Sequence, residues 1–123
     1  MKNKEFENWA LKKLEKIQKV LLLEDYYPIT ISFKEDKTAT AQAKFNYPYK
    51  SIDIFYSQGL LDNYVEKKYS FIIGVLIHEM VHSLTDPLYD CGYQRFLAKD
   101  QLENEREKLT DHIANIILKN KLI

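Results

Sequence analysis

The stretch that decides the fold is Val75-Leu76-Ile77-His78-Glu79-Met80-Val81-His82-Ser83-Leu84. It lies in a longer run, residues 69–84, whose side chains are apolar on almost every side of a helical projection. A helix that is hydrophobic all round is buried at the centre of a domain. The sequence therefore predicts a central helix that carries two histidines and a glutamate into apolar surroundings and that ends at Pro87.

His78, Glu79 and His82 have the spacing of a metal site on a helix. Side chains four residues apart share one helix face, about 5 to 6 Å apart, so both imidazoles can bind one tetrahedral zinc ion. Glu79 can then face a water in the open coordination position and act as general base. The simpler explanation is that a short pattern matches by chance. Burying these groups without partners costs about 1 to 3 kcal/mol each, however, and this favours the zinc site.

A catalytic zinc usually takes three protein ligands, and candidates for the third lie in the last predicted helix, residues 100–122. Glu107 and Asp111 share one helix face, so Glu107 can bind the metal while Asp111 accepts the ring N–H of a bound histidine. His112 is a rival ligand, although it lies about 100° round the helix from Asp111. Glu103 is a further candidate, one turn before Glu107. Without the upstream histidines, these acidic residues would be interpreted as a solvated helix start.

Stabilisation of a developing oxyanion requires a further donor near the metal. Tyr93, His112 and Tyr89 are the candidates, together with Arg95. The interpretation that Tyr89 and Tyr93 simply anchor a loop, predicted for residues 88–98, is favoured over a catalytic role.

Outside these two helices, the sequence predicts one more helix and a small sheet. Residues 3–23 repeat apolar side chains at helical spacing, which predicts an amphipathic helix. Residues 29–33 and 38–45 are predicted as two strands joined in a hairpin, and the alternation over 51–56 predicts a third strand. The second strand has small side chains, which suit either a peptide-accepting edge or packing beneath a crossing helix. We expect a cleft between the sheet edge and the central helix.

Length and charge indicate one ordinary domain. The chain has 123 residues, and we expect a single α+β domain over residues 1–123. Lys plus Arg and Asp plus Glu both total 18, so no net field favours nucleic acid or an anionic membrane. The apolar run 20–23 is too short for a signal peptide, and Cys91 is the single cysteine, expected to be an unreactive thiol. We predict a cytoplasmic protein without nucleic-acid or membrane partners.

The two site helices resemble the gluzincin group of zinc metallopeptidases, in particular its small phage-associated and ImmA/IrrE-like members. Residues 75–84 match the extended zincin helix pattern, and residues 107–114 are similar to the E-x-x-x-D glutamate helix of that group. The resemblance implies a zincin-like fold and a zinc ion bound by both motif histidines and Glu107, with Asp111 as a supporting companion. Larger gluzincins add a C-terminal subdomain that supplies a transition-state His or Tyr, so the resemblance leaves the oxyanion donor of this chain open.

The sequence therefore predicts a zinc-dependent metallopeptidase that hydrolyses a peptide or protein substrate, with Glu79 as general base. An extended substrate would pair with the edge strand predicted over 38–45. The alternative, from a different class, is a zinc-stabilised peptide-binding module with little or no protease activity. A latent peptidase whose N-terminal helix covers the cleft is disfavoured, because that helix has the pattern of core packing.

Overall fold

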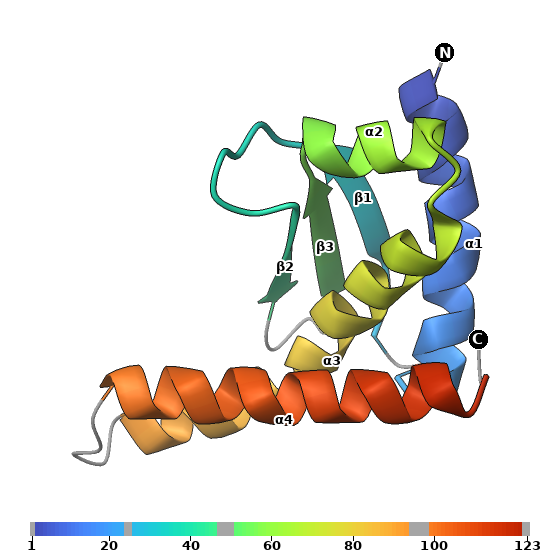
Figure 1. Ribbon diagram of the computed structural model, residues 1–123. Coiled ribbons are helices and arrows are strands. Elements are labelled where there is room, and N and C mark those ends of the chain that lie inside the picture. The colour runs from blue at the N-terminus through green and yellow to red at the C-terminus, as the bar shows by residue number, and fades with distance from the viewer. Residues whose placement is uncertain (1, 24–25, 47–50, 94–98, 122–123) are drawn as a thin grey trace.

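The computed structural model describes residues 2–23, 26–46, 51–93 and 99–121, and over residues 87–93 it describes the helical backbone. In these ranges the chain forms four helices and one three-stranded mixed sheet (Figure 1). The elements in chain order are α1 (Lys2–Val20), β1 (Ile29–Phe33), β2 (Ala41–Asn46), β3 (Ser51–Tyr56), α2 (Gln58–Val65), α3 (Tyr69–Tyr93) and α4 (Lys99–Lys119). The predicted α+β class is confirmed. None of the described helices has the length and apolar character to cross a membrane.

The sheet has the strand order β1-β3-β2. β1 runs parallel to β3, with Ile31 opposite Ile54, and β2 runs antiparallel to β3, with Ala43 opposite Ile54. The prediction of a hairpin between the first two strands is therefore wrong. β3 takes the central place because every second side chain of it is fully buried, at Ile52, Ile54 and Tyr56, whereas Ile31 alone is buried in β1.

β2 begins at Ala41, three residues after the predicted start at Thr38. Asp36 Oδ1 accepts hydrogen bonds from the backbone N–H of Thr38 (2.8 Å) and from its hydroxyl (2.7 Å). Such a local turn, which aspartate favours, competes with strand pairing. One side of β2 is paired with β3, and no described strand pairs with its other side. The small side chains of Ala41 and Ala43 lie on the core face of the sheet and allow α3 to pack closely against β2 there.

The core lies between the sheet and the two helices α1 and α3, which pack against it and against each other (Figure 1). α1 contributes one stripe at helical spacing, which confirms the amphipathic helix, and ends at Val20. Each fully buried leucine, isoleucine or phenylalanine contributes roughly 1.5 to 3 kcal/mol, so the burial of such side chains in the core fixes α3 against the sheet. The largest fully buried apolar side chains are Phe6, Leu14, Ile17, Ile52, Ile54, Tyr56, Leu60, Ile72, Leu76, Ile77, Met80 and Val81.

α3 differs from the predicted central helix in two respects. It is not covered all round, because Phe71 and Leu84 are 53% and 46% exposed. It also continues through Pro87 to Tyr93, so the predicted helix end and the predicted loop are wrong over residues 88–93. A proline inside a helix removes one hydrogen bond and costs about 3 kcal/mol. The packing of α3 on α4 is the most extensive between described elements and offsets that cost.

The two remaining helices complete the frame of the site. α2 has no counterpart among the predicted elements, because it is only eight residues long and buries just Leu60 and Leu61. A helical period cannot be recognised from two residues. α4 agrees with the predicted last helix to within a few residues and lies across the C-terminal half of α3 (Figure 1).

Candidate metal centre

A buried pair of threonines joins the two helices that carry the predicted site residues. Thr85 Oγ1 of α3 and Thr110 Oγ1 of α4 are 3.0 Å apart, and Thr110 also donates to the backbone oxygen of Arg106 (2.8 Å). A buried hydroxyl without a partner costs free energy, so this contact favours one alignment of the helices. The histidine face of α3 consequently lies opposite the acidic face of α4.

Each histidine ring is oriented by a carboxylate at its Nδ1 atom. His78 Nδ1 lies 2.8 Å from Asp111 Oδ1, and His82 Nδ1 lies 2.9 Å from Asp86 Oδ1. A carboxylate at Nδ1 holds the proton on that nitrogen and leaves the Nε2 lone pair available as an acceptor or metal ligand. Sequence analysis predicted Asp111 in this role but not Asp86, although Asp86 stands four residues after His82 on the same helix face.

The two Nε2 atoms point at one another. His78 Nε2 and His82 Nε2 are 3.2 Å apart, with the rings inclined at 79°. Two neutral imidazoles in this tautomer present two lone pairs to the same point, which is unfavourable unless a positive charge lies between them. His78, Glu79 and His82 form a group that could hold a metal ion, with one ligand atom from each lying within 4.8 Å of the others.

Glu107 reaches the same point from α4. Its Oε2 atom lies 3.2 Å from His78 Nε2, and its Oε1 atom lies 3.5 Å from His82 Nε2. Ligands at about 2.0 to 2.1 Å from a tetrahedral zinc lie about 3.3 to 3.4 Å from each other. The separation of the two Nε2 atoms and the distance from each of them to one oxygen of the Glu107 carboxylate are therefore close to the distances between ligands of such an ion.

Glu79 lies beside the two histidines and is largely shielded from solvent. Its Oε2 atom is 4.0 Å from His78 Nε2, and its side chain is 14% exposed. Burial raises the pKa of the Glu79 carboxyl, and the neighbouring His82 and His78 oppose this rise only in part. A carboxylate with a raised pKa is a stronger proton acceptor than an exposed one. Burial lowers the pKa of His82, but the hydrogen bond and charge of Asp86, together with the charges of Glu79 and Glu107, outweigh it and leave that pKa raised.

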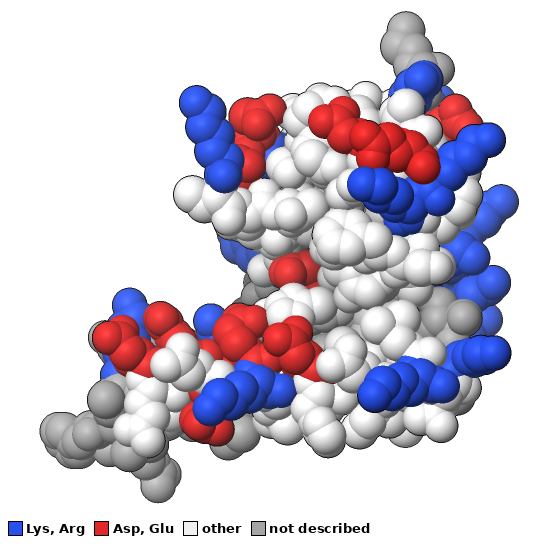
Figure 2. Space-filling model, in the orientation of Figure 1, with Lys and Arg blue, Asp and Glu red and all other residues white. Residues whose placement is uncertain are grey.

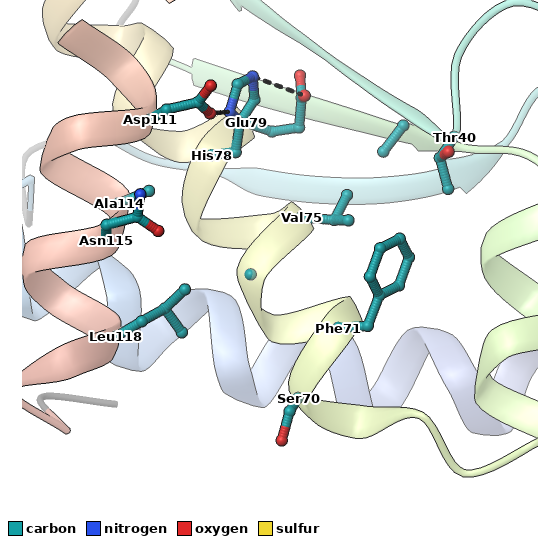
Figure 3. A pocket seen from close by; sticks show the side chains of 12 residues that line it. Thr40, Ser70, Phe71, Val75, His78, Glu79, Asp111, Ala114, Asn115 and Leu118 are labelled. Atoms are coloured by element: carbon teal, nitrogen blue, oxygen red, sulfur yellow. Dashed lines mark hydrogen bonds and ion pairs between the residues drawn. The ribbon is translucent and has the colours of Figure 1, made fainter. Parts of the chain in front are cut away.

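A cavity of about 490 Å³ opens beside His78 and Glu79 (Figure 3). In the close view the His78 ring lies between Asp111 and Glu79, and Phe71 and Val75 of α3 face the same space as Thr40. The side chains that line it come from the edge of the sheet, from α3 and from α4, and most are apolar or small. They are Thr40, Ala41, Ser70, Phe71, Gly74, Val75, His78, Glu79, Asp111, Ala114, Asn115 and Leu118.

A smaller hollow of about 220 Å³ lies beside His82 and Glu107. Glu79 lines both the cavity and this hollow, so the two spaces meet at Glu79. Residues of β2 line both of them, so the two spaces lie one after the other along that strand. Figure 2 shows the molecule hollowed between α4 and the part that holds the sheet, with carboxylates gathered along α4 at the rim. The smaller hollow is lined by Gln42, Ala43, Glu79, His82, Asp86, Arg106 and Glu107.

Two of the remaining candidate residues, His112 and Glu103, are described and are not brought to the two histidines. His112 is exposed on α4, and neither it nor Glu103 lines the two spaces described above. Glu103 lies 4.0 Å from Lys99, one turn away on the surface of α4. The side chains of Tyr89, Tyr93, Cys91 and Arg95 lie outside the described residues.

No protein-family model, curated protein or solved structure matches the chain.

Proposed function

We propose that the chain is a zinc-dependent metallopeptidase of the gluzincin type, in which His78, His82 and Glu107 hold the metal. The observation that carries this proposal is the meeting of two Nε2 atoms and a carboxylate at separations of 3.2, 3.2 and 3.5 Å, close to those between the ligands of a zinc ion. The two helices also occur in the order expected for a zincin-like fold.

The donor set supports zinc over harder cations. Two imidazoles and one carboxylate suit zinc, whereas Mg²⁺ and Ca²⁺ prefer oxygen ligands alone. Asp86 and Asp111 hold both Nδ1 protons, which makes the Nε2 atoms better donors to a metal. When bound, zinc supplies Lewis acidity and a water of lowered pKa.

Glu79 is the proposed general base. It accepts a proton from the attacking water and returns that proton to the leaving amine, so the proton balance closes on one side chain. Its burial suits this role, because burial raises the pKa of the carboxyl and so makes the carboxylate a stronger proton acceptor.

The substrate of this proposal is an extended peptide. β2 has an edge without a described strand neighbour, and both hollows follow that edge past Glu79. A peptide added along β2 would form main-chain hydrogen bonds there and place side chains in the two hollows. Most of the larger hollow is apolar, so we expect an apolar side chain to occupy it.

The second candidate function is a zinc-stabilised module that binds peptides without cutting them. It is favoured by one observation: within the described residues, neither hollow is lined by a tyrosine or by the exposed His112. His112, the predicted oxyanion donor whose side chain is described, is thus not at the position where a peptidase needs a donor in addition to the metal. Cleavage of a mixed peptide library, monitored by mass spectrometry, separates the two functions, because the binding module would retain peptides intact.

The experiment that tests the metal site is zinc content by mass spectrometry on protein purified without a histidine tag. Wild type is expected to hold one zinc per chain. Glu107→Ala should lose most of it, whereas His112→Ala, on the same helix but away from the metal group, should keep it. No bound metal after zinc is supplied would contradict the metallopeptidase proposal, and loss in His112→Ala alone would show that the wrong third ligand had been chosen.

A further inference from the structure

Arg106 occupies a position in the site that the predicted chemistry does not use. It directly precedes Glu107 on α4 and lines the smaller hollow together with Glu79 and His82. Its Nη1 atom lies 3.6 Å from Asp86 Oδ1 of α3, and its Nη2 atom lies 3.7 Å from Glu107 Oε1 of α4. One guanidinium group thus contacts a carboxylate from each of the two site helices.

The same two oxygen atoms contact the His82 ring at its opposite nitrogens. Asp86 Oδ1 lies 2.9 Å from Nδ1, and Glu107 Oε1 lies 3.5 Å from Nε2. Arg106, Asp86, His82 and Glu107 therefore form a closed ring of contacts. A displacement of the guanidinium would move both the group that orients His82 and the carboxylate opposite it.

Charge explains why a cation is needed at this point. Asp86, Glu79 and Glu107 all line the smaller hollow, and Arg106 is the only lysine or arginine among the described residues that line either hollow. Carboxylates this close repel each other and would turn towards solvent without a cation between them. A guanidinium is a rigid planar fork that can hold two carboxylates at a fixed separation, whereas a lysine ammonium is a single point charge on a flexible stem.

We propose that Arg106 is a positioning residue for the metal site. Arg106 holds Asp86 and Glu107 in place, so that His82 Nε2 and the Glu107 carboxylate both face the position of the zinc ion. This role rests on the proposed zinc site. It belongs to the chain before the metal arrives, because the ion pairs form among protein groups alone.

The test measures zinc affinity and not activity, by competition with a chromophoric chelator at equilibrium. Arg106→Gln and Arg106→Lys are compared with wild type and with Lys108→Gln, a matched control that removes a cation from the exposed face of α4. Loss of an outer partner of a metal ligand weakens binding about 10- to 100-fold. Both Arg106 variants are expected to bind zinc about tenfold more weakly, and the control to remain within about twofold of wild type.

The opposite outcome has a clear physical meaning. If Arg106 acted only as a positive charge that repels zinc, Arg106→Gln would bind zinc as tightly as wild type or more tightly, and the proposal would be overturned. Full affinity in Arg106→Lys would equally overturn it, because charge without the planar fork would then suffice. Circular dichroism of each variant verifies that the fold is retained, and Arg106→Lys preserves the test should Arg106→Gln fail to fold.

A double variant tests whether Arg106 acts through Asp86. Asp86→Asn combined with Arg106→Gln should weaken zinc binding by less than the product of the two single fold-changes, since groups in one network are not additive. Fold-changes that multiply would overturn the proposed connection. A wild-type chain that binds no zinc would overturn the proposed function as well, whereas wild-type binding with unaffected Arg106 variants would overturn this inference alone.

Discussion

Zinc should stabilise the fold of this chain, and Glu107→Gln should abolish most of that stabilisation. In the absence of a cation, two Nε2 atoms face each other at 3.2 Å and Glu107 adds a negative carboxylate to the same point. A ligand that binds the folded state alone stabilises it by RT ln(1 + [L]/Kd), which is about 2.7 kcal/mol at 100 times Kd. Unfolding entropy of about 2.1 cal/mol/K per residue gives about 0.26 kcal/mol/K for 123 residues. The expected rise in Tm is therefore about 10 °C.

Glu107→Gln replaces the charged ligand by a neutral amide of the same shape. If this weakens zinc binding by about 100-fold, the same zinc concentration equals Kd, and the stabilisation falls to about 0.4 kcal/mol, or about 1.6 °C. The assay is thermal unfolding followed by circular dichroism, with and without zinc and after treatment with a chelator. His112→Gln is the control, because His112 is exposed on the same helix, and it should keep the full shift.

Two results would refute this reasoning. A wild-type Tm that does not respond to zinc would mean that the meeting of the Nε2 atoms is not a metal site. A full shift in Glu107→Gln would mean that the metal is held by α3 alone, without a ligand from α4.

Three further predictions follow from the site and the core. Glu79→Gln should lower kcat by about 10²- to 10⁴-fold and leave zinc content unchanged, as assayed on any peptide that wild type cleaves; retained turnover would exclude Glu79 as the base. Ile17→Ala should cost about 2 to 5 kcal/mol in denaturant unfolding, whereas Ile116→Ala, at a site that is 47% exposed, should cost far less; equal losses would contradict the assigned core. Burial, followed by the hydrogen bond and charge of Glu7, raises the pKa of the Tyr56 hydroxyl. The unfolded chain therefore loses this proton first, and the free energy of unfolding should fall as pH rises above about 10. Tyr56→Phe should remove that part of the fall.

The sequence predicts the ligand geometry on α3 because it depends on local spacing. His78 and His82 are four residues apart, and any helix brings their side chains to one face. The same holds for Glu107 and Asp111 on α4. That the two helices meet face to face is a non-local fact, and the buried contact between their threonines, which helps to align them, has no periodic signature in the sequence.

The elements that were predicted wrongly depend on competition between distant segments. Strands adjacent in sequence usually pair, yet β1 pairs with β3, because burial of three β3 side chains outweighs the shorter connection. Pro87 is a strong local sign of a helix end, but α3 packs against α4 and continues beyond Pro87 to Tyr93. Asp86 and Arg106 were not predicted, although Asp86 stands one turn after His82; the role of Arg106 depends on a contact between two helices.

The open edge of β2 also bears on how the protein behaves in concentrated solution. An edge that can accept an extended peptide can equally accept the same edge of a second copy, which is the usual start of strand-to-strand aggregation. β2 is only six residues long and carries exposed Lys44 near its middle. Two copies joined antiparallel would bring their Lys44 ammonium groups near each other, whereas a peptide without a cation there meets no such repulsion. Self-association should therefore compete with peptide binding, and Lys44→Val should favour self-association.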